Sequence, residues 1–203
     1  MRFHNNIKCY LQVISSGLTA GILALALDFL PGNGLWSISS LASMYGLWII
    51  CACVFLWRSS SHLAAGLNVL FFYLFTALAF FGSIFLLGVF IPRLGYGGFA
   101  TKQFLHYAAV SLGCGILSFI LYSWSHNNWY GAIMLAVPIG LLAAETIIVL
   151  KLLHTYQTHL LQLLLNAGFC LYLGLQFRKL TKFKELFTVS VIFIAGLSYQ
   201  FLF

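Results

Sequence analysis

The sequence predicts an all-α, polytopic transmembrane helix bundle, and three observations support this prediction. Of the 203 residues, 62% are apolar and only 6% are charged, against about 25% charged in an average soluble domain. The mean hydropathy is +1.00. The apolar residues form continuous runs rather than the alternating pattern of a membrane barrel. A water-soluble fold cannot bury this much apolar surface, so a soluble globular enzyme and a disordered segment are both excluded.

Charged, Gly-rich and Pro-rich breaks divide the chain into about seven candidate spans, or six if the short last run does not cross. A crossing helix needs about 20 apolar residues. Pro31–Gly34 and Pro92–Gly98 cannot continue a helix, and 178–185 holds the main charge cluster. No linker is visible, so residues 1–203 are expected to form a single integral membrane domain. The candidate spans are Ile7–Phe29, Leu41–Trp57, Ala64–Ile91, Gln103–Trp124, Tyr130–Leu150, Thr158–Phe177 and Phe187–Phe203.

The basic residues predict the orientation, because Lys and Arg concentrate in cytoplasmic loops. An inside N-terminus leaves only Arg93, Lys102 and Lys151 outside the cell. We therefore predict a multi-pass protein with the N-terminus inside and the C-terminus outside. The net charge of +7 is explained by these topology signals and not by nucleic-acid binding. The basic residues on the predicted cytoplasmic side are Arg2, Lys8, Arg58, Arg178, Lys179, Lys182 and Lys184.

Polar and ionisable groups inside the bilayer are expensive and commonly functional. Glu145 is expected roughly 20 Å from the inner end of the fifth span, in the outer half of the hydrocarbon core. Several polar and aromatic residues fall at a comparable depth, and Pro138 is expected to bend the fifth span below Glu145. Such a set predicts an outward-opening pocket for a small molecule. The candidate ligand-binding residues are Glu145, Asn166, Thr76, Trp48, Tyr45, Asp28 and His106.

A structural interpretation of the same residues stays open. Glu145 can be protonated and hydrogen-bonded to Asn166, which would only lock two helices together. Thr76 can make a similar contact between helices. Asp28 can be a solvated carboxylate beside a turn, and His106 can be an interfacial histidine.

The first span carries a stripe of small residues that lets another helix approach closely. Gly17 and Gly21 form a GxxxG pattern, which favours tight helix packing. The packing helix can belong to the same chain or to a partner subunit, and the sequence leaves both open. The candidate partner interface consists of Ser16, Gly17, Ala20, Gly21 and Ala24.

Catalytic and metal-binding signatures are mostly missing. The sequence has no GxSxG, no HExxH and no pair of aspartates in a recognisable motif. His154 and His159 are five residues apart, so a helix would place them on different faces. The five cysteines include no CxxC pair and are interpreted as small buried apolar residues. We therefore expect no catalytic residue, no metal and no cofactor, and the sequence favours a role other than enzyme.

Two resemblances add expectations. The size, the short loops and the stripe Ser16/Ala20/Ala24 resemble the substrate-binding (S) components of energy-coupling factor vitamin transporters. That resemblance implies capture of a vitamin-like solute and docking of the first helix onto a coupling subunit, but those components have six helices. The Gly17…Asp28-Phe-Leu-Pro31 stretch, Trp48 and Ala143-Ala144-Glu145 also resemble a family of uncharacterised bacterial membrane proteins, which implies a bacterial inner (plasma) membrane location and no particular activity.

Three functions follow from the sequence. The first is a small membrane subunit that binds or helps transport a small solute through the predicted pocket. The second is a non-enzymatic accessory, immunity or assembly protein that acts through helix–helix contacts. The third is a membrane-embedded enzyme acting on a lipid-like substrate. The expected partners are the lipid bilayer, a membrane protein bound through the first helix and a small-molecule ligand, with no nucleic acid.

Overall fold

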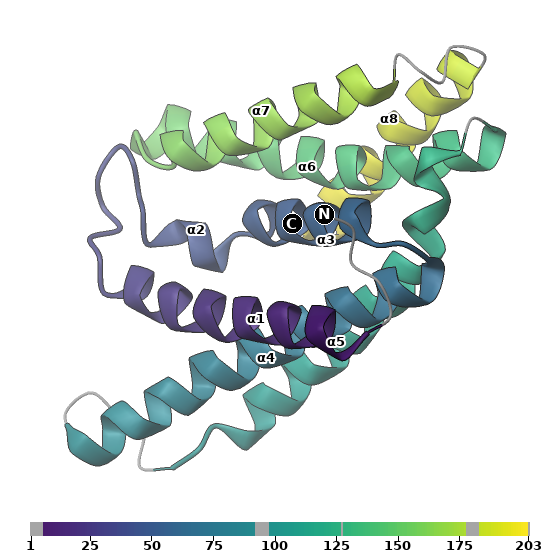
Figure 1. The fold of residues 1–203 in the computed structure, drawn as a ribbon. Coiled ribbons are helices and arrows are strands. Elements are labelled where there is room, and N and C mark those ends of the chain that lie inside the picture. Colours follow the sequence, from purple (N-terminus) through teal and green to yellow (C-terminus); the bar gives the residue numbers. More distant parts are fainter. Residues whose placement is uncertain (1–5, 92–97, 127, 178–182, 203) are drawn as a thin grey trace. The chain divides into compact units, whose positions relative to one another are not determined.

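The structure is a computed structural model that describes residues 6–91, 98–126, 128–177 and 183–202. Its regular secondary structure within these residues is helical, so the predicted all-α class is confirmed. Figure 1 shows the helices in sequence order. Their bounds are α1 Ile7–Asp28, α2 Ser40–Ser43, α3 Tyr45–Arg58, α4 His62–Phe90, α5 Thr101–Leu121, the 3₁₀ helix η2 Tyr122–Ser125, α6 Trp129–Tyr156, α7 Leu160–Phe177 and α8 Lys184–Leu202.

The polar breaks between the apolar runs act as helix caps. The Asn6 side chain accepts a hydrogen bond from the backbone N–H of Cys9 at the start of α1 (2.8 Å). Ser61 does the same at the start of α4, with Ala64 as donor (3.1 Å). Asn128 caps α6 through Gly131 (2.7 Å). Each cap satisfies a backbone N–H that has no partner within its own helix, which is why these helices begin where they do.

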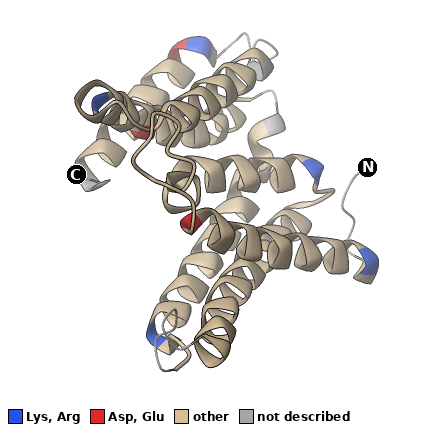
Figure 2. Ribbon diagram, turned by 90° about the vertical axis from the view of Figure 1, so that its left-hand side faces the viewer, with Lys and Arg blue, Asp and Glu red and all other residues tan. Residues whose placement is uncertain are grey.

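Four helices of the described chain are long and apolar enough to cross a membrane: α1, α4, α5 with η2, and α6. Figure 2 shows the ribbon as mostly free of charged residues, with Lys and Arg chiefly near helix ends. The chain is therefore a helical membrane protein. The seven spans and the orientation stay predictions. Five of the basic residues that predict the orientation lie outside the described residues: Arg2, Arg93, Arg178, Lys179 and Lys182.

The second predicted span, Leu41–Trp57, is not continuous. Met44 has an extended backbone (φ −91°, ψ 149°) and separates the four-residue helix α2 from α3. The indole N–H of Trp48 donates to the backbone oxygen of Ala42 across this break (2.8 Å). The apolar composition of this run predicted a helix correctly, but composition contains no information about a single extended residue inside it.

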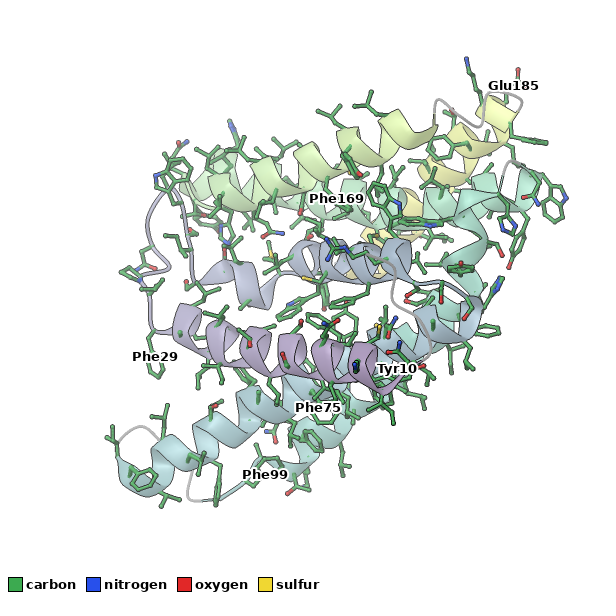
Figure 3. The ribbon with its side chains drawn as sticks, viewed as in Figure 1. Tyr10, Phe29, Phe75, Phe99, Phe169 and Glu185 are labelled. Carbon is green, nitrogen blue, oxygen red and sulfur yellow. The ribbon has the colours of Figure 1, made fainter. Side chains whose placement is uncertain are left out.

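The chain divides into two compact units, and the first comprises Met1–Phe29 and Phe55–Ile120. In this unit α1 packs along α4, and Gly17 and Gly21 lie directly against the α4 backbone. A Cβ built on Gly21 would overlap the backbone oxygen of Thr76. Tyr10, labelled in Figure 3, packs edge-on against Phe71 with ring centroids 5.5 Å apart. The small residues of α1 thus bring two helices of the same chain together.

The second unit comprises Leu30–Val54 and Leu121–Phe203, and α6 is its central helix. Both α7 and α8 pack against α6. A Cβ on Gly140 would lie only 2.8 Å from the Ile194 side chain of α8, so this glycine permits the close approach. The backbone N–H of Leu160 donates to the oxygen of Leu35 (3.0 Å), which ties the loop before α2 to the start of α7. The expectation that residues 1–203 form a single domain stays a prediction.

Candidate functional site

Three buried polar side chains of the second unit form a hydrogen-bonded chain between α6 and α7. Glu145 of α6 is 2% exposed, and Gln162 and Asn166 of α7 are 0% exposed. The Asn166 amide donates to Glu145 Oε2 (3.0 Å), and the Gln162 amide donates to Asn166 Oδ1 (2.9 Å). We call these three residues the polar cluster. Both hydrogen bonds run toward the carboxyl group, which is the direction an ionised carboxylate favours because it only accepts.

The N-terminus of α3 lies against the same carboxyl group. The backbone N–H groups of Tyr45 and Gly46, the first two residues of α3, donate toward Glu145. Met44 precedes them and has no oxygen in its side chain with which to cap the helix. The first N–H groups of a helix need acceptors, and its N-terminal end carries partial positive charge. Glu145 therefore does for α3 what a capping residue would normally do from the same helix.

Gly46 is what allows α3 to come this close. A Cβ built at this position would overlap Asn166 Oδ1, Glu145 Oε2 and Gln162 Nε2 at once. Any side chain larger than hydrogen would displace α3 or the cluster. The polar cluster thus depends on a backbone surface from α3 as well as on its own three side chains.

Two oxygens of the cluster have no hydrogen-bond partner. They are Glu145 Oε1 and Gln162 Oε1, both buried. Buried polar atoms in native structures are nearly always paired. Both unpaired atoms here are acceptors, so each of them lacks a hydrogen-bond donor.

Glu145 and Asn166 are hydrogen-bonded to each other, which is the contact that the structural interpretation of these residues allowed. Tyr45 joins the site through its backbone, whereas its side chain is 59% exposed. Trp48 is half-buried in α3, and its indole N–H is bonded across the helix break. Of the seven candidate ligand-binding residues, these four belong to the unit that holds the polar cluster.

The other three candidates belong to the first unit. Thr76 is buried, and its hydroxyl donates within α4 to the backbone oxygen of Phe72 (2.7 Å). Asp28 is exposed at the last residue of α1. His106 is exposed on α5, with its ring beside that of Tyr107 (5.7 Å between centroids). Their participation in ligand binding stays a prediction.

The candidate partner interface is largely occupied within the chain. Gly17, Gly21 and Ala24 are buried, and the two glycines pack against α4. Ala20 is half-buried, whereas Ser16 is exposed and donates to the oxygen of Gln12 in its own helix (2.8 Å). Packing within the chain was one of the two open explanations of this stripe, and it accounts for both glycines. Docking of a partner stays a prediction.

Two residues of the site were not predicted from the sequence. Gln162 stands four residues before Asn166, so a helix places both on one face, and this spacing was the available signal. Gly46 follows Tyr45 directly, but its role depends on which helix faces it. That neighbour is set by the tertiary structure and not by the local sequence.

A groove of about 230 Å³ lies elsewhere, between α4 and α5 of the first unit. It contains no residue of the polar cluster. The described residues also contain no group of three or more His, Cys, Asp or Glu side chains that could hold a metal ion. The groove is lined by Leu63, Gly66, Leu67, Leu70, Leu112, Gly115, Ile116 and Phe119.

Fold and site together define a helical membrane protein with a buried carboxyl–amide cluster at the start of an interrupted helix. Comparison with known proteins found no matching family model, no matching curated protein and no similar solved structure. The two resemblances noted in the sequence therefore stay predictions.

Proposed function

We propose that this chain is a small subunit of the bacterial inner membrane that binds a small solute, or helps transport it, at the polar cluster. The observation that carries the proposal is the interruption at Met44, which leaves the N-terminus of α3 against the buried carboxyl of Glu145. Interrupted helices form the substrate and ion sites of many transporters, and here the start of α3 holds the Glu145 carboxyl in place while Glu145 Oε1 has no partner.

Two features favour a binding role over simple helix attachment. A contact that only joins α6 to α7 needs no third helix, yet α3 is broken and its first turn faces Glu145. A purely structural cluster would also be expected to pair all its polar atoms, because an orphaned buried acceptor destabilises the fold. The free oxygens of Glu145 and Gln162 offer a ligand two acceptors within one cluster, whereas the third unpaired buried oxygen of the described residues, Asn68 Oδ1, is a single atom in the first unit.

The alternatives receive less support. An accessory protein acting through the first helix would need a free small-residue face, but Gly17 and Gly21 pack against α4. An enzyme would need a nucleophile or a second acid–base group beside Glu145. The recorded neighbours of this carboxyl are two side-chain amides and two backbone N–H groups.

Native mass spectrometry of the protein purified from its own membranes in mild detergent tests the proposal. We expect a small molecule to be retained by the wild-type protein and lost, or held at least about tenfold more weakly, by the Gln162→Met variant, which replaces a polar side chain of the cluster by an apolar one. Ser111→Ala is the matched control, because it removes the hydroxyl of a buried residue that is hydrogen-bonded inside α5. Equal retention of the molecule by wild type and Gln162→Met would contradict the proposal, as would a wild-type protein that carries only lipid.

A further inference from the structure

We propose that the polar cluster binds a single positive charge, either a proton or a small monovalent cation such as Na⁺, at Glu145 Oε1 and Gln162 Oε1. The inference deepens the proposed function and rests on it for a role in transport, because it names the charged species that accompanies the solute. Its evidence is the hydrogen-bond inventory of the cluster, its burial and its charge.

The inventory shows which kind of group is missing. Asn166 and Gln162 both use amide N–H groups within the cluster, and α3 adds two backbone donors. The atoms left without partners are two oxygens, with no unpaired nitrogen among the buried side chains of the cluster. A ligand that only accepts hydrogen bonds, such as an anion, would leave both of these oxygens unpaired and would be repelled by the Glu145 carboxylate. A proton or a metal cation satisfies oxygens of this kind directly.

The charge of the site limits the cation to one positive charge. The cluster contains one carboxylate, and its other oxygens belong to neutral amides. One bound positive charge makes the buried site neutral, whereas a divalent ion would leave a net charge in the apolar interior, which is expensive. The described residues also contain no cluster of three or more His, Cys, Asp or Glu side chains, which a transition metal would require.

Among the described residues, no positively charged side chain is recorded beside Glu145 that could neutralise its carboxylate instead. The interactions recorded for the Glu145 carboxyl come from Asn166, Gln162 and the α3 backbone. The elements around it carry further titratable groups, but Lys151 of α6 contacts Tyr199 of α8 instead. The remaining titratable groups on these elements are Tyr45, Cys51, Cys53 and Arg58 on α3, Tyr130, His154 and Tyr156 on α6, Cys170 and Tyr172 on α7, and Lys184 and Glu185 on α8.

Glu145→Gln is an informative variant because the cluster dictates its orientation. Asn166 donates to Glu145 Oε2, so the glutamine must place its carbonyl oxygen there and its NH₂ at the position of Oε1. The variant thus supplies a permanent donor without a charge, and it imitates the protonated or cation-loaded state. Protonation itself adds one O–H bond at Oε1, with the proton taken from solvent and returned to it on release.

Thermal unfolding of the purified protein in detergent tests the inference. The melting temperature is measured between about pH 5 and pH 9, a range that includes the pKa of histidine and the raised pKa values documented for buried glutamates. Each series is run in NaCl, KCl or choline chloride at constant ionic strength. A ligand that binds only the folded state raises stability with its concentration. For a proton, the folded state binds more protons than the unfolded state, so stability falls as pH rises.

We expect the wild-type melting temperature to rise with Na⁺ or K⁺, with falling pH, or with both. A response to the metal cation at fixed pH identifies the cation, and a response to pH in choline chloride identifies the proton. Glu145→Gln should respond to neither and should melt near the temperature of the loaded wild type. Ser111→Ala, which removes a hydroxyl bonded inside α5, should respond as the wild type does. A wild type that responds to neither species, or a Glu145→Gln variant that responds as the wild type does, would overturn the inference.

Gln162→Met provides a second test if Glu145→Gln does not fold. It replaces the whole amide of Gln162, both Oε1 and the N–H group that donates to Asn166, at similar size and retains Glu145. We expect the concentration of Na⁺ or H⁺ that gives half the shift to rise about tenfold. An unchanged midpoint would contradict the assignment of this oxygen. A solute held equally at all pH values and in all three salts would overturn the inference and leave the proposed function standing. A melting temperature that responds to Na⁺, K⁺ or pH in a protein that retains no solute would support the inference and contradict the proposed function.

Discussion

At the residue scale, the environment of Glu145 is set by three elements at once. Its carboxyl accepts from Asn166 of α7 and from the first backbone N–H groups of α3. The same glutamate on an isolated apolar helix would have to be neutralised or turned toward a lipid headgroup. Its position in the described structure makes it both a cap for α3 and the acidic member of the polar cluster.

Gly46 should be among the least replaceable residues of the chain. We expect Gly46→Ala to lower the free energy of unfolding by about 1–3 kcal/mol, because the new methyl group would overlap atoms of all three cluster side chains. Chemical or thermal unfolding in detergent measures the change. Gly174→Ala is the matched control in α7, where a Cβ would meet nothing within 4 Å. Equal stability of the two variants would contradict the packing described at Gly46.

Asn166 connects the other two members of the cluster. Asn166→Leu should destabilise the protein by about 0.6 kcal/mol, which is the average contribution of a hydrogen bond between membrane helices. The loss can reach about 3 kcal/mol if Glu145 Oε2 is left unpaired, and thermal unfolding in detergent measures it.

The Asn166→Asp variant should instead place two carboxyl groups side by side. We expect its stability to decrease as pH rises, because ionising both groups introduces repulsion. Stability of Asn166→Asp that is independent of pH would contradict this expectation.

At the scale of elements, the first helix shows that a sequence pattern can predict a close helix contact without predicting which helix makes it. The GxxxG pattern predicted a close helix contact, and α4 of the same chain provides that contact. The polar caps of α1, α4 and α6 were visible in the sequence as breaks. The end of α2 was not predicted, because Met44 is itself a good helix former and lies inside an apolar run.

Gly21 should control the packing of α1 on α4. We expect Gly21→Ala to lower the melting temperature of the purified protein, because a methyl group there would push against the α4 backbone at Thr76 and Phe80. Gly82→Ala, on α4 itself, meets open space and should change stability by no more than about 1 kcal/mol. If Gly21→Ala melts like the wild type but loses a co-purifying protein, the glycine face serves a partner instead.

At the scale of the whole molecule, the number of crossings depends on α3, α7 and α8, which are not among the four candidate spans, and α3 is the shortest of the three. Its 14 residues span about 21 Å at 1.5 Å per residue, which is shorter than a hydrocarbon core of about 30 Å. The helix can complete a crossing with α2 or return to the side from which it enters. The prediction of seven spans and an outside C-terminus requires it to cross.

Labelling of introduced cysteines decides between these topologies. In a variant without the five native cysteines, we expect Asn33→Cys to react in whole cells with a maleimide that cannot cross membranes. Ser60→Cys should react only after the cells are opened, because the prediction places it inside. Reaction of both positions from outside would show that α3 does not cross, and the predicted orientation of every later span would then be wrong.

The sequence by itself determined the class of fold and the residues that end most helices. Both follow from local properties, namely apolar run length and the ability of Asn and Ser side chains to bond a nearby backbone N–H. It also singled out Glu145 and Asn166, because polar groups inside apolar runs are visible in a linear list. The break at Met44, the role of Gly46 and the separation of Thr76, Asp28 and His106 from the unit holding the cluster were decided only by tertiary structure. The physical reason is that each depends on which helices face one another, and contacts between distant segments leave little trace in the local sequence.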